Sequence, residues 1–514
     1  MQFLKICLPL FALALPLAAQ GPIVTTAQGQ VMGDSLKAGG AVFKAIPFAQ
    51  PPVGDLRWRE PAAPKAWTGV REGHHFAAPC AQIDANWNTV AAKTGNEDCL
   101  NLNVWSPEWP SRAAKPVMVW FYGGGNTGGS FLGEGGIEPS FDGERLARHG
   151  VLVVTIGYRL GLLGFLAHPE LTEESSHHAS GNYGLLDQIA ALRWVHDNIA
   201  RFGGDPANVT IFGQSAGAHD VGMLMASPLA RGLFHKAIGE SGSVVIRAGL
   251  TPSRQDREEA GVRLAARLGA PAKGSIKFLR GLSTAEILKA APDYNDRGPD
   301  RPEPDIDGYV IAKQPAAVFR AGEEAPVPLL IGNNGRERNV AGGVAGLAKE
   351  AEAFYGSLAP KTLKLYATAD TNYAPHGDAN AQFATDVQFR CSAATIAGWH
   401  SAKSPTFEYE FTRAPEPRGA VHSWELQYVF GNLKQATEDA DRKLSDQVQE
   451  YWTNFAKTGN PNGANVPAWP KHDPAKREYI ELSANGPIAK SALRVPFCDV
   501  WREKLAGSLA SSKP

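Results

Sequence analysis

Continuous apolar runs that alternate with helical segments are the feature that most restricts the fold of this chain. Runs of this length are typical of strands buried on both faces of a parallel sheet. They cover 117–121, 151–156, 209–212, 237–238 with its flanks, 327–331 and the more alternating 407–411. Apolar residues recur at helical spacing over 185–199 and 444–455. The sequence therefore predicts an α/β fold with a large, mostly parallel central sheet flanked by helices.

The bulk composition is that of a globular protein. The chain has 514 residues, of which 43% are hydrophobic and 20% charged, and a formal net charge of -1. This balance excludes a disordered chain and gives no support for a nucleic-acid partner. We expect residues 20–514 to form a single domain, with the Pro- and charge-rich segment 291–304 as a surface excursion.

The N-terminal segment 1–19 has the pattern of a cleaved signal peptide. Lys5 precedes an apolar run over 6–15, and small residues ending at Ala19 offer a cleavage site. A first buried strand is the alternative. No apolar stretch is long enough to span a bilayer, so we expect a secreted or periplasmic protein without a membrane anchor.

Five cysteines are present, and Cys7 would leave with the signal peptide. The remaining four allow three complete pairings in an oxidising compartment. None of them is part of a CxxC pair, so the sequence predicts neither a zinc site nor another metal site.

One serine is placed where a strand turns into a helix, in Gly213-Gln214-Ser215-Ala216-Gly217. In this context G-x-S-x-G is typical of a nucleophile elbow, in which small neighbours let a strained turn expose the hydroxyl. The competing interpretation is an ordinary N-cap serine. A nucleophilic serine needs a base and donors for an oxyanion. Backbone N–H groups of Gly124, Gly125 and Ala216 could supply the donors, although a glycine run can also be merely a flexible loop.

Several further motifs follow one another along the chain: "PPVGDLRW", "EDCLNLNVW", "WFYGGGN", "GYRLGLLGFLAHPEL", "FGQSAGA", "PDIDG", "GAVHSWELQYVFGN" and "GNPNG". In this order they resemble the type-B carboxylesterase and lipase family, the cholinesterase-like branch of the α/β-hydrolases. The resemblance spans most of the chain. It implies an α/β-hydrolase fold with loop and helix insertions that form a gorge, and a serine esterase without a cofactor.

The family's order of serine, acid and histidine implies His422 as the base, because "GAVHSWELQYVFG" matches the family's histidine motif. Its rivals are His219, one helical turn after Ser215, and the late His400 and His472.

The family's acidic residue corresponds to Glu337 in "LLIGNNGRERN". Arg336 and Arg338 stand where the family has aspartate and glycine, so Glu337 could instead be a surface partner of these arginines. Asp305 and Asp307 are more distant candidates. The resemblance also implies two structural disulfides, Cys80–Cys99 and Cys391–Cys498.

These residues predict hydrolysis of a small-molecule ester through an acyl-enzyme on Ser215. A non-catalytic binding protein similar to neuroligins is the alternative class, and lipase, amidase, thioesterase or cholinesterase specificity also stays open. For the substrate pocket the candidates are Trp87, Gln214, His219 and Asp220. Gln214 replaces the glutamate of cholinesterases, so we expect neutral short-chain or aromatic esters to be preferred over choline esters, unless Asp220 supplies a charge to the pocket.

Overall fold

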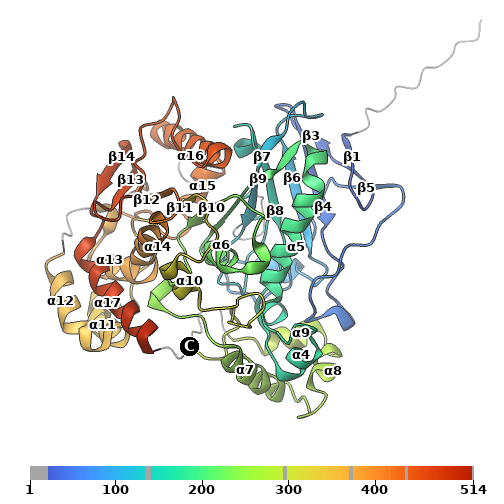
Figure 1. The fold of residues 1–514 in the computed structure, drawn as a ribbon, viewed down its shortest axis with the longest axis horizontal. Coiled ribbons are helices and arrows are strands. Elements are labelled where there is room, and N and C mark those ends of the chain that lie inside the picture. Colours follow the sequence, from blue (N-terminus) through green and yellow to red (C-terminus); the bar gives the residue numbers. More distant parts are fainter. Residues whose placement is uncertain are drawn as a thin grey trace, which may run out of the picture.

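A computed structural model describes residues 21–133, 140–292, 298–369, 374–415, 417–434 and 438–511. Within these ranges, eleven strands form one sheet in the order β14-β13-β12-β11-β10-β9-β7-β8-β6-β4-β3 (Figure 1). A small second sheet contains β1 (Ile23–Thr25), β2 (Gln30–Met32) and β5 (Val70–Glu72). The strands of the large sheet are β3 (Asp34–Ser35), β4 (Ala41–Pro47), β6 (Asn101–Ser106), β7 (Lys115–Phe121), β8 (Leu152–Ile156), β9 (Gly204–Gln214), β10 (Lys236–Glu240), β11 (Leu329–Asn334), β12 (Thr406–Phe411), β13 (Glu478–Ser483) and β14 (Gly486–Ser491).

The centre of the large sheet is parallel and both edges are antiparallel. Strands β8, β7, β9, β10, β11, β12 and β13 run in one direction. At one edge β14 is antiparallel to β13, and at the other β6, β4 and β3 follow antiparallel to β8 and to one another. The predicted α/β fold with a mostly parallel sheet is confirmed.

Helices surround this sheet. The longer ones are α5 (Tyr183–Asn198), α6 (Ala216–Ala226), α7 (Arg254–Arg267), α14 (Cys391–Ser401), α16 (Asp439–Thr458) and α17 (Val495–Ser511). The shorter ones are α1 (Thr89–Thr94), α2 (Glu144–Ala147), α3 (Gly161–Phe165), α4 (Pro169–Glu174), α8 (Ser275–Arg280), α9 (Thr284–Lys289), α10 (Pro315–Ala321), α11 (Leu347–Tyr355), α12 (Ala359–Ala367), α13 (Ala379–Thr385) and α15 (Leu426–Val429).

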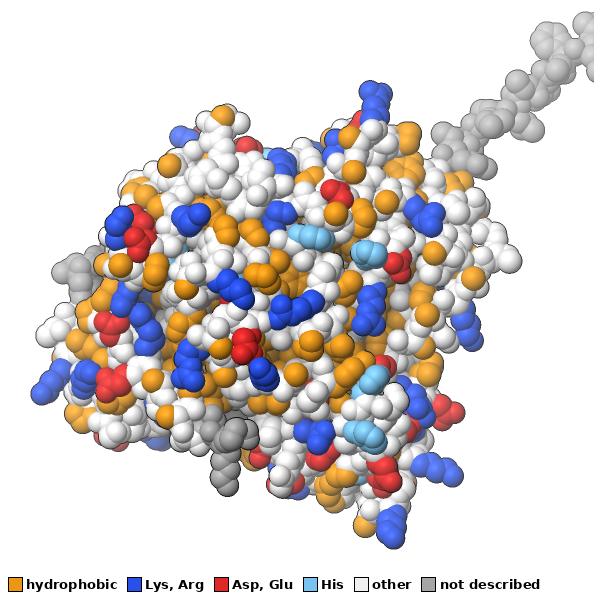
Figure 2. Space-filling model, viewed as in Figure 1, with side chains coloured by type: hydrophobic (Ala, Val, Ile, Leu, Met, Phe, Trp, Pro, Cys, Tyr) orange, Lys and Arg blue, Asp and Glu red, His pale blue; other side chains and the backbone are white. Residues whose placement is uncertain are grey.

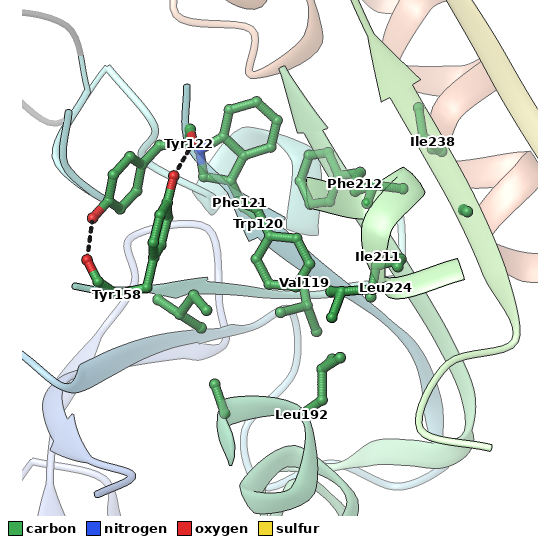
Figure 3. Close-up of a cluster of buried hydrophobic side chains, with 14 of the residues drawn as sticks. Val119, Trp120, Phe121, Tyr122, Tyr158, Leu192, Ile211, Phe212, Leu224 and Ile238 are labelled. Atoms are coloured by element: carbon green, nitrogen blue, oxygen red, sulfur yellow. Dashed lines mark hydrogen bonds between the residues drawn. The ribbon is translucent and has the colours of Figure 1, made fainter. Parts of the chain in front are cut away.

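Both faces of the sheet are covered, as the alternation of side chains along β7 and β9 shows. Val119 and Ile211 lie with Leu192 of α5 and Leu224 of α6 on one face (Figure 3). Neighbouring side chains point to opposite faces of a strand, and the Trp120 ring meets Phe141, Phe212 and Phe430 at centroid distances of 4.8–5.1 Å. This burial explains why these strands read as continuous apolar runs.

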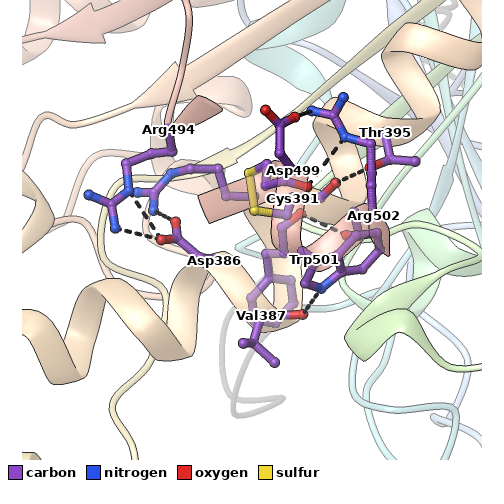
Figure 4. Close-up of a disulfide and its surroundings, with 12 residues drawn as sticks. Asp386, Val387, Cys391, Thr395, Arg494, Asp499, Trp501 and Arg502 are labelled. Atoms are coloured by element: carbon purple, nitrogen blue, oxygen red, sulfur yellow. Dashed lines mark hydrogen bonds and ion pairs between the residues drawn. A yellow bond between two sulfur atoms is a disulfide. The ribbon is translucent and has the colours of Figure 1, made fainter. Parts of the chain in front are cut away.

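Two disulfides lie in the structure. Cys80–Cys99 closes a loop with a Cα–Cα distance of 5.0 Å. Cys391–Cys498 joins α14 to α17, and Figure 4 shows it beside Trp501, whose Nε1 donates to the Val387 carbonyl at 3.0 Å. Within the described ranges, no helix has both the length and the apolar character needed to cross a bilayer.

Two sequence predictions concern the segments 1–19 and 291–304. The segment 1–19, predicted as a signal peptide, lies outside the described residues. The end of the predicted surface excursion 291–304 is not superficial, because Arg301 is buried and donates to the Gly125 carbonyl at 2.9 Å. That prediction is wrong for its last residues, since a charge-rich segment can bury an arginine whose hydrogen bonds are satisfied.

Candidate active site

Ser215 occupies a strained turn between β9 and α6. Its backbone has φ 56° and ψ -118°, a region that residues with a Cβ rarely adopt. The turn is held by the Ser215 N–H, which donates to the Glu240 carbonyl at 2.8 Å. A Cβ at Gly213 or Gly217 would lie 2.6 Å or 2.0 Å from backbone atoms, so glycine is required at both positions. The strand-turn-helix context expected for a nucleophile elbow is therefore present.

Ser215, His422 and Glu337 come together from three separate turns. His422 Nε2 lies 2.8 Å from Ser215 Oγ, and His422 Nδ1 lies 2.7 Å from Glu337 Oε2. An ionised carboxylate only accepts hydrogen bonds, so Nδ1 carries the ring proton and Nε2 is free to accept the serine proton. The turns follow the parallel strands β9, β11 and β12, with β10 between β9 and β11, and the carboxyl ends of these strands lie at one edge of the sheet.

The Glu337 carboxylate is held from several sides. Its side chain is fully buried, and Oε1 accepts from the Asn334 N–H at 2.7 Å. The Glu337 N–H donates to Thr385 Oγ1 at 3.0 Å, and its carbonyl accepts from the His422 N–H at 3.1 Å. This framework fixes both the carboxylate and the imidazole, and it makes a role as surface partner of Arg336 and Arg338 wrong.

Two further buried carboxyl groups lie behind the cluster. Burial raises the pKa of Glu240 to about 8, although Trp452 Nε1 donates to its Oε1 at 2.7 Å. Burial, together with the negative charges of Glu337 and Glu240, raises the pKa of Glu425 well above its usual value. Asn334 Nδ2 donates to the Glu425 carboxyl group. A neutral Glu425 adds no second negative charge beside Glu337.

The predicted oxyanion donors flank the serine. Gly124 and Gly125 have φ of 116° and 65°, conformations that favour glycine. Ala216 begins α6 directly after Ser215. Within the described part of the chain, the N–H groups of these three residues donate to no other residue. They are therefore available to a ligand.

Two cavities meet at the serine. The first is about 450 Å³ and is lined by residues that include Trp87, Gly124, Gln214 and His422. The second is about 270 Å³ and its lining includes Gly125, Ala216 and His219. Ser215 lines both. Among the described residues, no three His, Cys, Asp or Glu side chains are grouped so that they could hold a metal ion.

Three of the four predicted pocket residues do line these cavities. Trp87 packs on the glycine loop, where a Cβ at Gly124 would lie 3.0 Å from its ring. Gln214 Nε2 lies 3.4 Å from His422 Nε2. His219 lines the second cavity, not the first.

Asp220 is not a pocket residue, and that prediction is wrong. Its side chain is fully buried and accepts from Asn126 Nδ2 at 2.8 Å and from Gln188 Nε2 at 2.6 Å. The carboxylate thus points into the protein, where paired donors compensate its burial. His219 and Asp220 are consecutive in α6, yet His219 lines the second cavity and Asp220 faces the core. The sequence alone does not show which of two adjacent polar residues faces the pocket.

Sequence reasoning missed the cationic residues of the second cavity. Arg247 and Arg301 line it together with Arg338, which in the sequence is visible only as a departure from the family pattern. Arg247 lies in a single 3-10 turn, Ile246–Ala248, and Arg301 lies in a loop. Neither carries a motif, so no sequence signal identifies them. The arginine that replaces a family glycine at position 338 was the one available indication.

Comparisons with known proteins agree with this geometry. The sequence profile of the Carboxylesterase family matches residues 20–501. A fumonisin B1 esterase of Sphingopyxis macrogoltabida is 36% identical over 90% of this chain and 87% of that protein. A human cocaine esterase is 33% identical, with 94% and 91% covered. Among solved structures, a PNB esterase superposes with a TM-score of 0.79 at 33% identity, covering 94% of this chain and 99% of the other. A carboxylesterase of Geobacillus stearothermophilus gives 0.81 at 31% identity, with 93% and 99% covered.

Proposed function

The chain belongs to the carboxylesterase family and is a carboxylic ester hydrolase, and from this premise we propose that it acts as an exported serine esterase. Residues 20–514 form its catalytic domain, Ser215 is the nucleophile, His422 is the general base and Glu337 orients the base. The observation that carries this proposal is the pair of short contacts from His422, 2.8 Å to Ser215 Oγ and 2.7 Å to Glu337 Oε2.

The chemistry follows from these positions. Ser215 Oγ attacks the ester carbonyl while His422 Nε2 accepts its proton. The N–H groups of Gly124, Gly125 and Ala216 stabilise the resulting oxyanion. As the bond to the alcohol breaks, His422 returns the proton to the leaving oxygen. Water, activated by the same ring, then attacks the acyl-enzyme and releases the acid.

Labelling and turnover test the nucleophile together. A fluorescent serine-reactive phosphonate should label the wild type and fail to label Ser215→Ala, and 4-nitrophenyl butanoate should be hydrolysed only by the wild type. A folded wild type that neither reacts with the phosphonate nor hydrolyses the ester would support the neuroligin-like alternative.

Discrimination against choline esters is part of the proposal. A quaternary ammonium group needs an aromatic face and gains from a nearby negative charge. Trp87 offers a ring in the first cavity, but Gln214 is neutral and Asp220, on α6, is buried away from that cavity. The described lining of that cavity therefore contains no carboxylate to attract the cation.

Export is supported by the apolar N-terminal segment and by two disulfides, which persist in oxidising compartments. N-terminal sequencing of the mature protein from periplasm or culture medium tests it. A first residue close to position 20 is expected, and an intact Met1 in the folded, active enzyme would contradict export by cleavage.

A further inference from the structure

Arg338, like the proposed nucleophile Ser215, lies between the two cavities. Among the described residues, Ser215 and Arg338 are the two that line both of them. Arg338 is partly exposed, and within the described part of the chain its side chain makes no hydrogen bond or ion pair. An unpaired guanidinium beside the reacting serine is available to a substrate.

The second cavity is the more cationic of the two. Its described lining contains Arg247, Arg301 and Arg338 against a single carboxylate, that of Glu303. Arg247 is exposed and, within the described residues, has no partner for its side chain. Glu303 faces its own cation, since Arg257 Nη1 lies 3.8 Å from its Oε1. The remaining charge in this cavity is positive, and its walls reduce screening by solvent.

The position of His422 decides which half of an ester enters this cavity. The ring must return a proton to the leaving alcohol, so the alcohol lies on the His422 side. His422 lines the first cavity and not the second. The acyl chain therefore extends into the second cavity, past Ala216 and towards the arginines.

We propose, on the basis of the esterase function above, that the preferred substrates are half-esters of di- or polycarboxylic acids. The free carboxylate of the acyl group pairs with Arg338 and Arg247 in the second cavity. Guanidinium groups are well suited to this partner, because they donate two parallel hydrogen bonds to a carboxylate. This substrate class replaces the neutral acyl group predicted from the sequence.

Three esters of equal length and different charge test the proposal. Monobutyl adipate carries a carboxylate at the end of its acyl chain, butyl adipamate carries a neutral amide and butyl 6-aminohexanoate carries an ammonium group. We expect kcat/KM for the anion to exceed that for the amide by about tenfold, as partly buried charge pairs allow, and that for the ammonium ester to be lowest. Added NaCl should reduce the preference because it screens the pair.

Variants locate the effect. Arg338→Gln and Arg247→Gln should each lower the ratio of anion to amide by about threefold or more. Arg336→Gln is the matched control, because Arg336 adjoins Glu337 on the same loop, lines neither cavity and donates to the Pro417 carbonyl at 3.1 Å. It should leave the ratio unchanged. A fourth ester, 5-(butanoyloxy)pentanoate, carries its carboxylate on the alcohol instead of on the acyl group. We expect the carboxylate to give no gain in kcat/KM for this ester.

The outcomes separate this proposal from the esterase function. Hydrolysis of 4-nitrophenyl butanoate that depends on Ser215, together with an amide ester cleaved as well as the anion, overturns the proposal and leaves the function intact. A preference for the anion only on the alcohol side also overturns it. If none of these esters is cleaved by the folded protein, both fail.

Discussion

The backbone of Ser215 has a local conformational cost that fits its proposed role as nucleophile. A serine with φ 56° is held there by its surroundings, namely the Glu240 carbonyl and the close approach of Gly213, Gly217 and Gly242. A Cβ at Gly242 would lie 2.3 Å from the Ser215 carbonyl oxygen. The glycines around the serine are thus a packing requirement, which is why the elbow could be recognised from the sequence.

Removal of the nucleophile should abolish turnover and leave the fold unchanged. Ser215→Ala deletes one oxygen, and loss of such a nucleophile costs on the order of a million-fold in kcat. His422→Ala should cost a similar amount, and the double variant should be no worse than either single variant because the groups act as a unit. Steady-state kinetics on 4-nitrophenyl butanoate, with circular dichroism for the fold, measure both. Appreciable activity in Ser215→Ala would reject the assignment.

Asp220→Asn should weaken the fold without changing the substrate preference. The carboxylate accepts from two side-chain amides, whereas an asparagine presents one oxygen and an NH2 group that faces a donor. An unsatisfied buried group costs about 1–3 kcal/mol. Thermal unfolding should therefore shift to lower temperature. The ratio of kcat/KM for butyrylcholine to that for 3,3-dimethylbutyl butanoate, its uncharged isostere, should stay below one and unchanged; a cation preference lost in this variant would make Asp220 the anionic site.

At the scale of elements, the sequence predicted the strands that are buried on both faces and missed the edges. The predicted runs 117–121, 151–156 and 407–411 correspond to β7, β8 and β12 within two residues. The antiparallel edge strands were not predicted, because β3 is two residues long and β6 alternates asparagine with apolar residues. The three candidate triad residues, which the structure brings into contact, were identified from motifs attached to predicted strands. The arginines of the second cavity did not, because only the packing of distant loops brings them together.

The two disulfides should differ in their contribution to stability. Their sequence separations are 19 and 107 residues. If the effect arises from the entropy of the unfolded chain, the short loop contributes roughly 3 kcal/mol and the long one about 5 kcal/mol. The double variant Cys391→Ser/Cys498→Ser should therefore lower Tm more than Cys80→Ser/Cys99→Ser, and reductant should lower the wild-type Tm. Free thiols at Cys391 and Cys498 in the native enzyme, detected by mass spectrometry, would contradict this.

On the scale of the whole molecule, charge is distributed unevenly. The formal net charge is -1, yet the face in Figure 2 shows Lys and Arg side chains around a hollow with apolar walls. Inside the protein, carboxyl groups such as Glu240 are buried without a cation against them. The surface determines how a ligand approaches, while the buried acids make the stability of the whole fold depend on pH.

Glu240→Gln should become relatively more stable as pH rises. The folded pKa of Glu240 is raised from 4.5 to about 8 by burial. Between these values the folded state holds a proton that the unfolded state lacks, so the wild type loses up to about 1.4 kcal/mol per pH unit. Glutamine keeps the acceptor for Trp452 and does not titrate. Tm measured across this range at one scan rate should show a difference, variant minus wild type, that grows with pH; parallel curves would contradict a raised pKa.

The Cys80–Cys99 loop forms part of the wall of the first cavity. Its ends are 5.0 Å apart, it projects Trp87 against the glycine loop at Gly124, and it contributes no strand to the large sheet. Internal anchors such as Asn88 Nδ2 to Gln82 Oε1 at 2.7 Å lie within the loop itself. Substitutions within this loop therefore reshape one wall of the first cavity without altering the serine, histidine or glutamate of the proposed triad, as long as Gln82 keeps its two hydrogen bonds with the Gly129 backbone.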